Sequence, residues 1–200
     1  IGTDSDRALL LDFQATLEIK PEKAIKLEKD ALAQIENITA DNARLVSNLH
    51  ANLGGLYRMN GHPDLAREHM EKSISLLDQF NLLHINDSIP QIANYAMFLT
   101  EQQEPERGIS ELQKLSGIIK EYHSDDCLDY AKVQETLGTI YLMTANLPQA
   151  KTHFKRAFKI YEKIWADEPE MIEAKYQEIQ ELYPQIGFSI GKTLSGLLTK

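Results

Sequence analysis

The sequence repeats with a period of 42 residues, and this period constrains the fold more than any other feature. Leu53, Tyr95 and Leu137 are each 42 residues apart. The same spacing relates further sets in which side-chain size is largely kept: Gly54/Ala96/Gly138, Tyr57/Leu99/Tyr141, Ala66/Gly108/Ala150, Met70/Leu112/Phe154 and Pro21/Pro63/Pro105. A fixed period of this length is typical of stacked supersecondary units that share one core, and such stacks mostly present binding surfaces.

Each unit is predicted to be a pair of helices, which makes the fold all-α. Apolar side chains recur at spacings of three and four through residues 43–80, on both sides of a break at 60–63. The pattern returns over 89–121, with a break at 104–105, and over 127–165, with a break at 146–148. Each break contains Pro, which the first turn of a helix tolerates, and the first break also contains a Gly that suits a helix end.

Small residues in the middle of the first helices predict close helix contacts. Gly54 and Gly138 stand where Gly costs about 1 kcal/mol relative to Ala. We expect this cost to be offset by a close approach to the paired helix, which carries Ala66 or Ala150 opposite. The large residues of each unit then fill the space between layers.

The motif resembles the tetratricopeptide repeat. Leu53-Gly54-x-x-Tyr57 is followed by Ala66, Met70 and Ser73, and the pattern recurs at Leu137-Gly138-x-x-Tyr141 with Ala150, Phe154 and Ala157. The period of 42 is similar to the long form found in kinesin light chain and in bacterial regulators. The resemblance implies an α-solenoid of antiparallel helix pairs, a right-handed superhelix of about four to five repeats.

We expect one solenoid domain over residues 1–200. Its repeats are predicted at 5–46 (degenerate), 47–88, 89–130 and 131–172, followed by a partial repeat and a C-terminal capping helix over 173–200. Asp12 departs from the motif, which has a small residue there. The helix expected over 186–200 either caps the last apolar face or occupies the groove. The sequence does not begin with Met, which suggests a piece of a longer protein.

Net charge and cysteine content limit the kinds of partner and the cellular compartment that we expect. The net charge of -9 argues against direct nucleic-acid binding and against an anionic membrane as partner. The single cysteine, Cys127, excludes an intrachain disulfide and fits a reducing compartment, so we expect a cytoplasmic protein.

No motif indicates catalysis, a metal or a cofactor, and we expect none of the three. Gly191-Lys192-Thr193 matches the end of a phosphate loop, but the motif needs Gly where Ile186 stands. The six histidines show no metal-ligand spacing, which favours structural roles for them.

The resemblance implies a concave groove lined by the first helices, with these positions facing it: Asn48, Ala51, Asn52, Gly55, Arg58 and Met59; Ala93, Asn94, Met97 and Thr100; Lys132, Glu135, Thr139, Leu142 and Met143. Only Arg58 and Lys132 are basic, so the family's clamp for a terminal carboxylate is missing. Small residues, Met and amides are expected to bind a partly apolar helix or extended segment. The alternative is an ordinary solvated inner surface.

We therefore expect a non-enzymatic scaffold that binds a protein or peptide, with a homodimer as a further option. The alternative function is a regulatory or peptide-sensing segment of a larger multidomain protein, such as a transcription regulator or a signalling NTPase.

Overall fold

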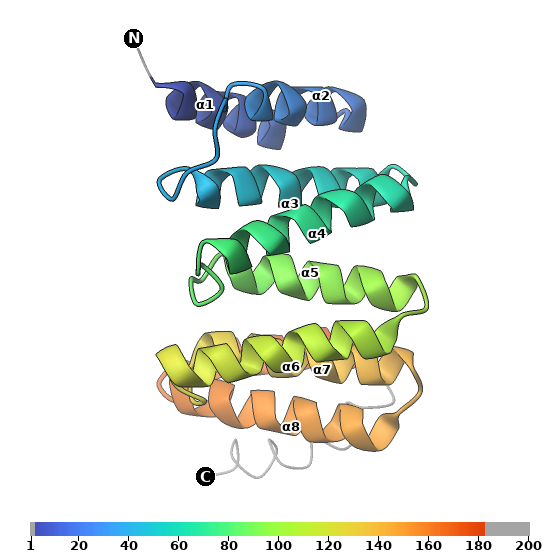
Figure 1. Cartoon of the computed structure of the whole chain (residues 1–200). Helices are drawn as coiled ribbons and strands as arrows, with labels where there is room; N and C mark the ends of the chain where they lie inside the picture. The colour runs from blue at the N-terminus through green and yellow to red at the C-terminus, as the bar shows by residue number, and fades with distance from the viewer. Residues whose placement is uncertain (1–2, 183–200) are drawn as a thin grey trace. The chain divides into compact units, whose positions relative to one another are not determined.

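The computed structural model describes residues 3–182, and their secondary structure is entirely helical (Figure 1). The helices are α1 (Asp4–Leu17), α2 (Pro21–Leu32), α3 (Ala43–Met59), α4 (Pro63–Gln79), α5 (Ser88–Glu101), α6 (Pro105–Tyr122), α7 (Leu128–Met143), α8 (Leu147–Ile164) and α9 (Pro169–Leu182). The predicted all-α solenoid of helix pairs is confirmed. The expected capping helix over 186–200, with its Gly191-Lys192-Thr193, lies outside the described residues.

The chain divides into two compact units, and the boundary between them falls after Glu111, within α6. In the first unit α1 packs against α2 and α3 against α4, and α5 follows α4 (Figure 1). In the second unit α7 pairs with α8, and α9 contacts α8. The breaks predicted from Pro63 and Pro148 separate α3 from α4 and α7 from α8, and the break predicted from Pro105 separates α5 from α6.

The same turn ends the first helix of three successive units. Its left-handed residue is Gly61 (φ 76°), then Gln103 (φ 64°), then Ala145 (φ 59°), each 42 residues apart. In each turn the next residue donates its N–H to a carbonyl five residues earlier, for example His62 to Tyr57 at 2.9 Å. This hydrogen bond satisfies a carbonyl that the helix end would otherwise leave unpaired.

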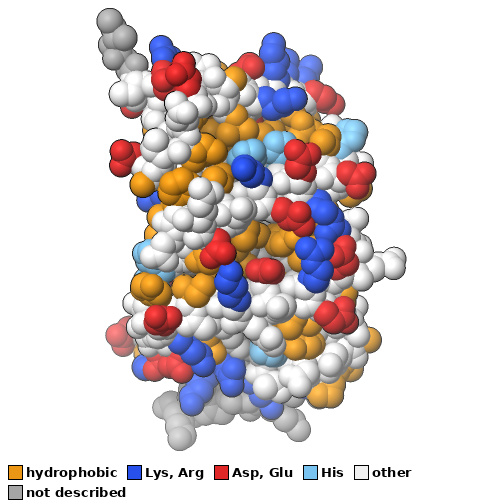
Figure 2. All heavy atoms as spheres, in the orientation of Figure 1, with side chains coloured by type: hydrophobic (Ala, Val, Ile, Leu, Met, Phe, Trp, Pro, Cys, Tyr) orange, Lys and Arg blue, Asp and Glu red, His pale blue; other side chains and the backbone are white. Residues whose placement is uncertain are grey.

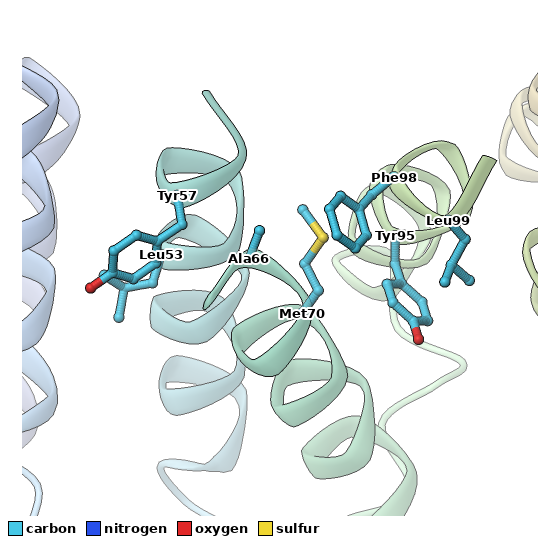
Figure 3. Packing of buried hydrophobic residues seen from close by; sticks show 7 residues of the cluster. All are labelled: Leu53, Tyr57, Ala66, Met70, Tyr95, Phe98 and Leu99. Atoms are coloured by element: carbon cyan, nitrogen blue, oxygen red, sulfur yellow. The ribbon is translucent and has the colours of Figure 1, made fainter. Parts of the chain in front are cut away.

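Small residues stand where the helices of a pair come close, but large side chains fill the space beside them, and no atom of the expected neighbour Ala150 is among those nearest to Gly138. A Cβ added at Gly54 would lie 2.5 Å from Cγ of Met70 and 3.3 Å from the carbonyl oxygen of Ala66. A Cβ at Gly138 would lie 2.9 Å from the Phe154 ring. The side chain of Met70 therefore fills the space beside Gly54. It points toward Phe98 of α5 in the apolar cluster of Figure 3.

A second repeated device joins the helices of a pair. Tyr57 of α3 stacks on His69 of α4 with ring centroids 5.4 Å apart, and Tyr141 of α7 stacks on His153 of α8 at 5.2 Å. Burial lowers the pKa of both His69 and His153, which keeps the stacked rings neutral. The histidines thus act in packing.

The surface carries charges of both signs. On the described part of the face that Figure 2 shows, basic and acidic side chains are interspersed, with apolar side chains exposed between them. Within residues 3–182, no helix has the length and apolar character that crossing a membrane requires.

Candidate binding groove

One face of α3 stays open while the opposite face is buried. Val46, Leu53 and Tyr57 are buried in the core. Two cavities open on the other side. The first has a volume of about 220 Å³ and is lined by Ala51, Gly55, Arg58, Met59, Met70, Ser73, Gln91 and Asn94. The second has a volume of about 320 Å³ and is lined by Asp12, Thr16, Asn48, Ala51, Asn52, Asp87, Pro90, Gln91 and Asn94. We call the surface formed by these two cavities the inner groove.

The two cavities of the inner groove are lined by all six residues predicted on α3 and by one of the four predicted on α5. The six on α3 are Asn48, Ala51, Asn52, Gly55, Arg58 and Met59, and the one on α5 is Asn94. The α5 residues Ala93, Met97 and Thr100 do not line these two cavities. Ala93 and Met97 are half-buried, and the Thr100 hydroxyl donates to the Ala96 carbonyl within its own helix at 2.9 Å.

The residues predicted on α7 have varied surroundings within the second unit. Leu142 is buried, and Glu135 accepts a hydrogen bond from the Tyr161 hydroxyl at 2.6 Å and pairs with Lys175 of α9 at 2.9 Å. Thr139 donates to the Glu135 carbonyl. Lys132 and Met143 are exposed. Their role in binding stays a prediction.

Helix α1 adds groove residues that sequence reasoning missed. Asp12 and Thr16 line the second cavity. Counting back 42 residues from Ala51, Gly55 and Met59 also gives Leu9, Phe13 and Leu17, whose side chains are 49%, 60% and 68% exposed. These three side chains form an apolar stripe on α1, in the register of the groove residues of α3. Counting in steps of 42 residues could have found these three positions from the sequence, although the first repeat (5–46) is degenerate.

Gln91, also missed, fixes the floor of the groove by joining three helices. Its Nε2 donates to Oδ1 of Asn48 on α3 at 2.6 Å. Its Oε1 accepts from the hydroxyl of Ser47 on α3 at 2.9 Å and from that of Ser73 on α4 at 2.6 Å. Both serines are buried. A floor held by buried hydrogen bonds is preorganised, which lowers the entropy cost of binding.

The charged side chains that line the second cavity, Asp12 and Asp87, are both acidic. Asp12 accepts a hydrogen bond from Nδ2 of Asn52 at 2.9 Å, and the same nitrogen donates to Oε1 of Glu28 at 3.1 Å. Glu28 is only 1% exposed, and its burial, together with the nearby charge of Asp12, raises its pKa to about 8. Asn52 therefore helps to hold the groove together, in addition to its predicted role as a groove residue.

Two ion pairs border the groove. Arg58 pairs with Glu101, with Nε and Oε2 2.8 Å apart, and Arg44 pairs with Asp87 at 2.6 Å. The hydrogen bond from Arg44 lowers the pKa of Asp87, so this carboxylate is ionised at neutral pH. Glu101 partly neutralises the charge of Arg58. Asp12, in contrast, lines the cavity with the amide of Asn52 as its hydrogen-bond donor.

Sequence and structure comparisons agree with this architecture. A family model described as "Tetratricopeptide repeat" matches residues 88–163. Residues 88–163 are thus similar to tetratricopeptide repeats. No curated protein matches the sequence.

Two solved structures are similar in fold to this chain. The crystal structure of BtubC (BKLC) from P. vanneervenii has a TM-score of 0.72 and 17% identity, over 97% of this chain and 80% of that chain. A putative kinesin light chain from Podosopora anserina, with nearly identical TPR-like repeats, has a TM-score of 0.63 and 14% identity, over 73% of this chain and 69% of that chain. At these identities the likeness shows the fold alone.

Within residues 3–182, no three or more His, Cys, Asp or Glu side chains form a cluster suited to a metal ion. His50 and His69 lie with their Nδ1 atoms 2.9 Å apart. Burial and the neighbouring His69 lower the pKa of His50 to about 4, so this pair packs in its neutral form.

Proposed function

We propose that this chain is a protein–protein interaction module whose inner groove binds a peptide or helix of a partner protein. The observation that carries the proposal is that seven residues chosen from the repeat register line two adjoining cavities on α3 and α5. Tetratricopeptide repeats generally mediate interactions between proteins, which supports binding over bond-making chemistry as the role of this surface.

The groove offers the contacts that an amphipathic segment needs. The side chain of Met59 is 80% exposed and the stripe of Leu9, Phe13 and Leu17 extends the apolar surface along α1. Covering such side chains stabilises a complex by about 25 cal/mol for each Å² of apolar surface buried. The exposed amide of Asn94 can donate to and accept from a peptide backbone.

The test is a selection of binding peptides from a displayed random library, using the intact chain as bait. Hydrogen exchange with a bound peptide should then show new protection in α1, α3 and α5. Asn94→Leu should weaken binding at least tenfold and leave the circular dichroism spectrum unchanged, because the side chain is exposed.

Gln79→Leu is the matched control, since Gln79 is an exposed amide at the end of α4 and does not line either cavity. Peptides that bind Asn94→Leu as well as wild type, with protection confined to α2 and α4, would place the binding surface elsewhere.

A further inference from the structure

The first cavity lies at a position where one repeat has glycine and the repeats before and after it have large side chains. Gly55 lies within α3, and a Cβ added there would meet no atom within 4 Å. The equivalent positions 42 residues before and after hold Phe13 and Met97. The cavity of about 220 Å³ above Gly55 is bordered by Met59 and reaches down to Met70. A volume of this size accommodates one large apolar side chain.

The second cavity is of different chemistry. Asp12 and Asp87 line it, and none of the described residues lining it is Lys or Arg. Beneath its wall, Glu28 is hydrogen-bonded to the lining residue Asn52, while its buried Oε2 lacks a hydrogen-bond partner among the described residues. Arg44 neutralises part of the charge of Asp87, which leaves Asp12 as the carboxylate able to pair with an incoming cation.

The two cavities adjoin. Ala51, Gln91 and Asn94 line both of them. One short segment of a partner can therefore reach both cavities with side chains that are close in its sequence.

We propose that the inner groove recognises a partner segment that carries a large apolar side chain and, close to it, a Lys or Arg. The apolar side chain enters the cavity above Gly55, and the cation pairs with Asp12. The inference rests on the proposed function, because it assumes that the groove binds a protein segment. It adds the chemistry of that segment: a large apolar side chain that contacts Met59 and Met70, and a cation that pairs with Asp12. Arg58 also lines the first cavity, where its charge is paired with Glu101.

The first test reads the chemistry from the selected peptides themselves. Random 12-residue peptides enriched on the intact chain should share Leu, Met or Phe at a fixed spacing from Lys or Arg. In synthetic copies of an enriched peptide, replacing the apolar residue by Ala or the basic residue by Glu should each weaken binding at least tenfold. Enriched peptides without a basic residue would overturn the inference.

The second test fills the cavity from the protein side. Gly55→Leu should reduce the affinity of the enriched peptide at least tenfold, while the smaller Gly55→Ala reduces it less. Gly117→Leu is the matched control, since Gly117 is a glycine of α6 whose added Cβ also meets no atom within 4 Å. Circular dichroism checks that all three variants keep their helices, and Gly55→Ala keeps the test valid if the larger change unfolds the chain.

The third test removes the negative charge. Asp12→Asn should abolish the preference for Lys over Gln in the peptide, because the carboxylate and not the amide attracts the cation. An unchanged preference would contradict the pairing.

The outcomes separate the inference from the proposed function. Binding that Asn94→Leu weakens and Gly55→Leu does not would overturn the inference and leave the groove as a peptide site. Enrichment of no peptide would overturn both. Self-association of the wild type that Gly55→Leu abolishes would assign the groove to a second copy of this chain and overturn the inference.

Discussion

Asp12 and Glu28 occupy, in the first unit, the positions that Gly54 and Met70 hold in the second and that Gly138 and Phe154 hold in the fourth. In the other repeats, the first of these positions holds a small residue and the second holds a large apolar residue. Here two acids take their place, with Asn52 of α3 donating a hydrogen bond to each. A buried acid in this position is tolerated when it is protonated, because a neutral carboxyl loses far less hydration than a carboxylate.

This pair predicts a pH dependence of stability. The pKa of Glu28 is raised from an ordinary value of 4.5 to about 8, so between these values the folded chain keeps a proton that the unfolded chain has released. The free energy of unfolding therefore falls as the pH rises from 4.5 to about 8. Glu28→Gln, which keeps an acceptor for Asn52, should remove this loss and stabilise the chain at pH 9 by on the order of 3 kcal/mol.

Urea unfolding at several pH values between 5 and 9 measures the effect as a difference between variant and wild type. The comparison matters because the lowered pKa of His50 acts in the opposite sense as the pH falls toward about 4. Glu22→Gln, an exposed position on the same helix, serves as the control. Equal pH dependence of Glu28→Gln and wild type would show that Glu28 is ionised in the fold.

At the residue scale, the repeat register predicted apolar and small positions well and polar ones poorly. The close helix contacts at Gly54 and Gly138 were expected from their spacing, although the side chains nearest to them are Met70 and Phe154 and not the expected alanines. Glu28 stands 42 residues before Met70 and was still missed. An acid does not belong to an apolar pattern, and its burial depends on Asn52 and Asp12, which reach it from other helices.

At the element scale, the helix ends were predictable because Pro21, Pro63, Pro105 and Pro148 stand in the first turns. The extent of the groove was not predictable in the same way. From the sequence we expected the groove to begin at α3, yet Asp12 and Thr16 of α1 line its second cavity. The α1 side chains Leu9, Phe13 and Leu17 are exposed at the equivalent positions. The degenerate first unit hid this because its polar residues weaken the motif.

The stripe on α1 yields a prediction for that helix. Phe13→Ser combined with Leu17→Ser should change the free energy of unfolding by no more than about 0.5 kcal/mol, because both side chains are mostly exposed. The double variant should weaken the binding of groove-binding peptides about fivefold or more, since α1 loses apolar surface at the positions equivalent to Gly55 and Met59. Titration calorimetry and thermal unfolding measure the two effects.

Leu65→Ser provides the control for α1, because Leu65 is an exposed leucine (40%) on α4, the second helix of its pair. A drop in unfolding free energy well above that of the control would mean that the stripe is covered in the folded chain. Unchanged peptide affinity would exclude α1 from the binding surface.

At the scale of the whole molecule, the fold follows from one physical constraint repeated along the chain. Each helix pair leaves an apolar face that the next helix must cover, as Met70 of α4 meets Phe98 of α5 in Figure 3. In such a stack, stability is approximately a sum of terms within units and between nearest neighbours. The period of 42 residues predicted this much, whereas the chemistry of the groove depends on residues that break the period, such as Gly55 and Asp12.

If stability comes mainly from contacts between neighbouring units, a substitution in the core should destabilise mainly the helices next to it. Phe154 of α8 is fully buried against Gly138 of α7, so Phe154→Ala should destabilise the second unit by about 3–5 kcal/mol. Because the lost contacts are local, hydrogen exchange should speed up in α7, α8 and α9 and stay close to wild type in α1, α2 and α3. The mirror variant, Met70→Ala in α4, should speed exchange in α3, α4 and α5 and spare α8 and α9. Mass spectrometry of exchanged peptides distinguishes this pattern from an equal acceleration of exchange along the chain. An equal acceleration would show that the two compact units unfold as one cooperative body. The nearest-neighbour description would then fail for this stack.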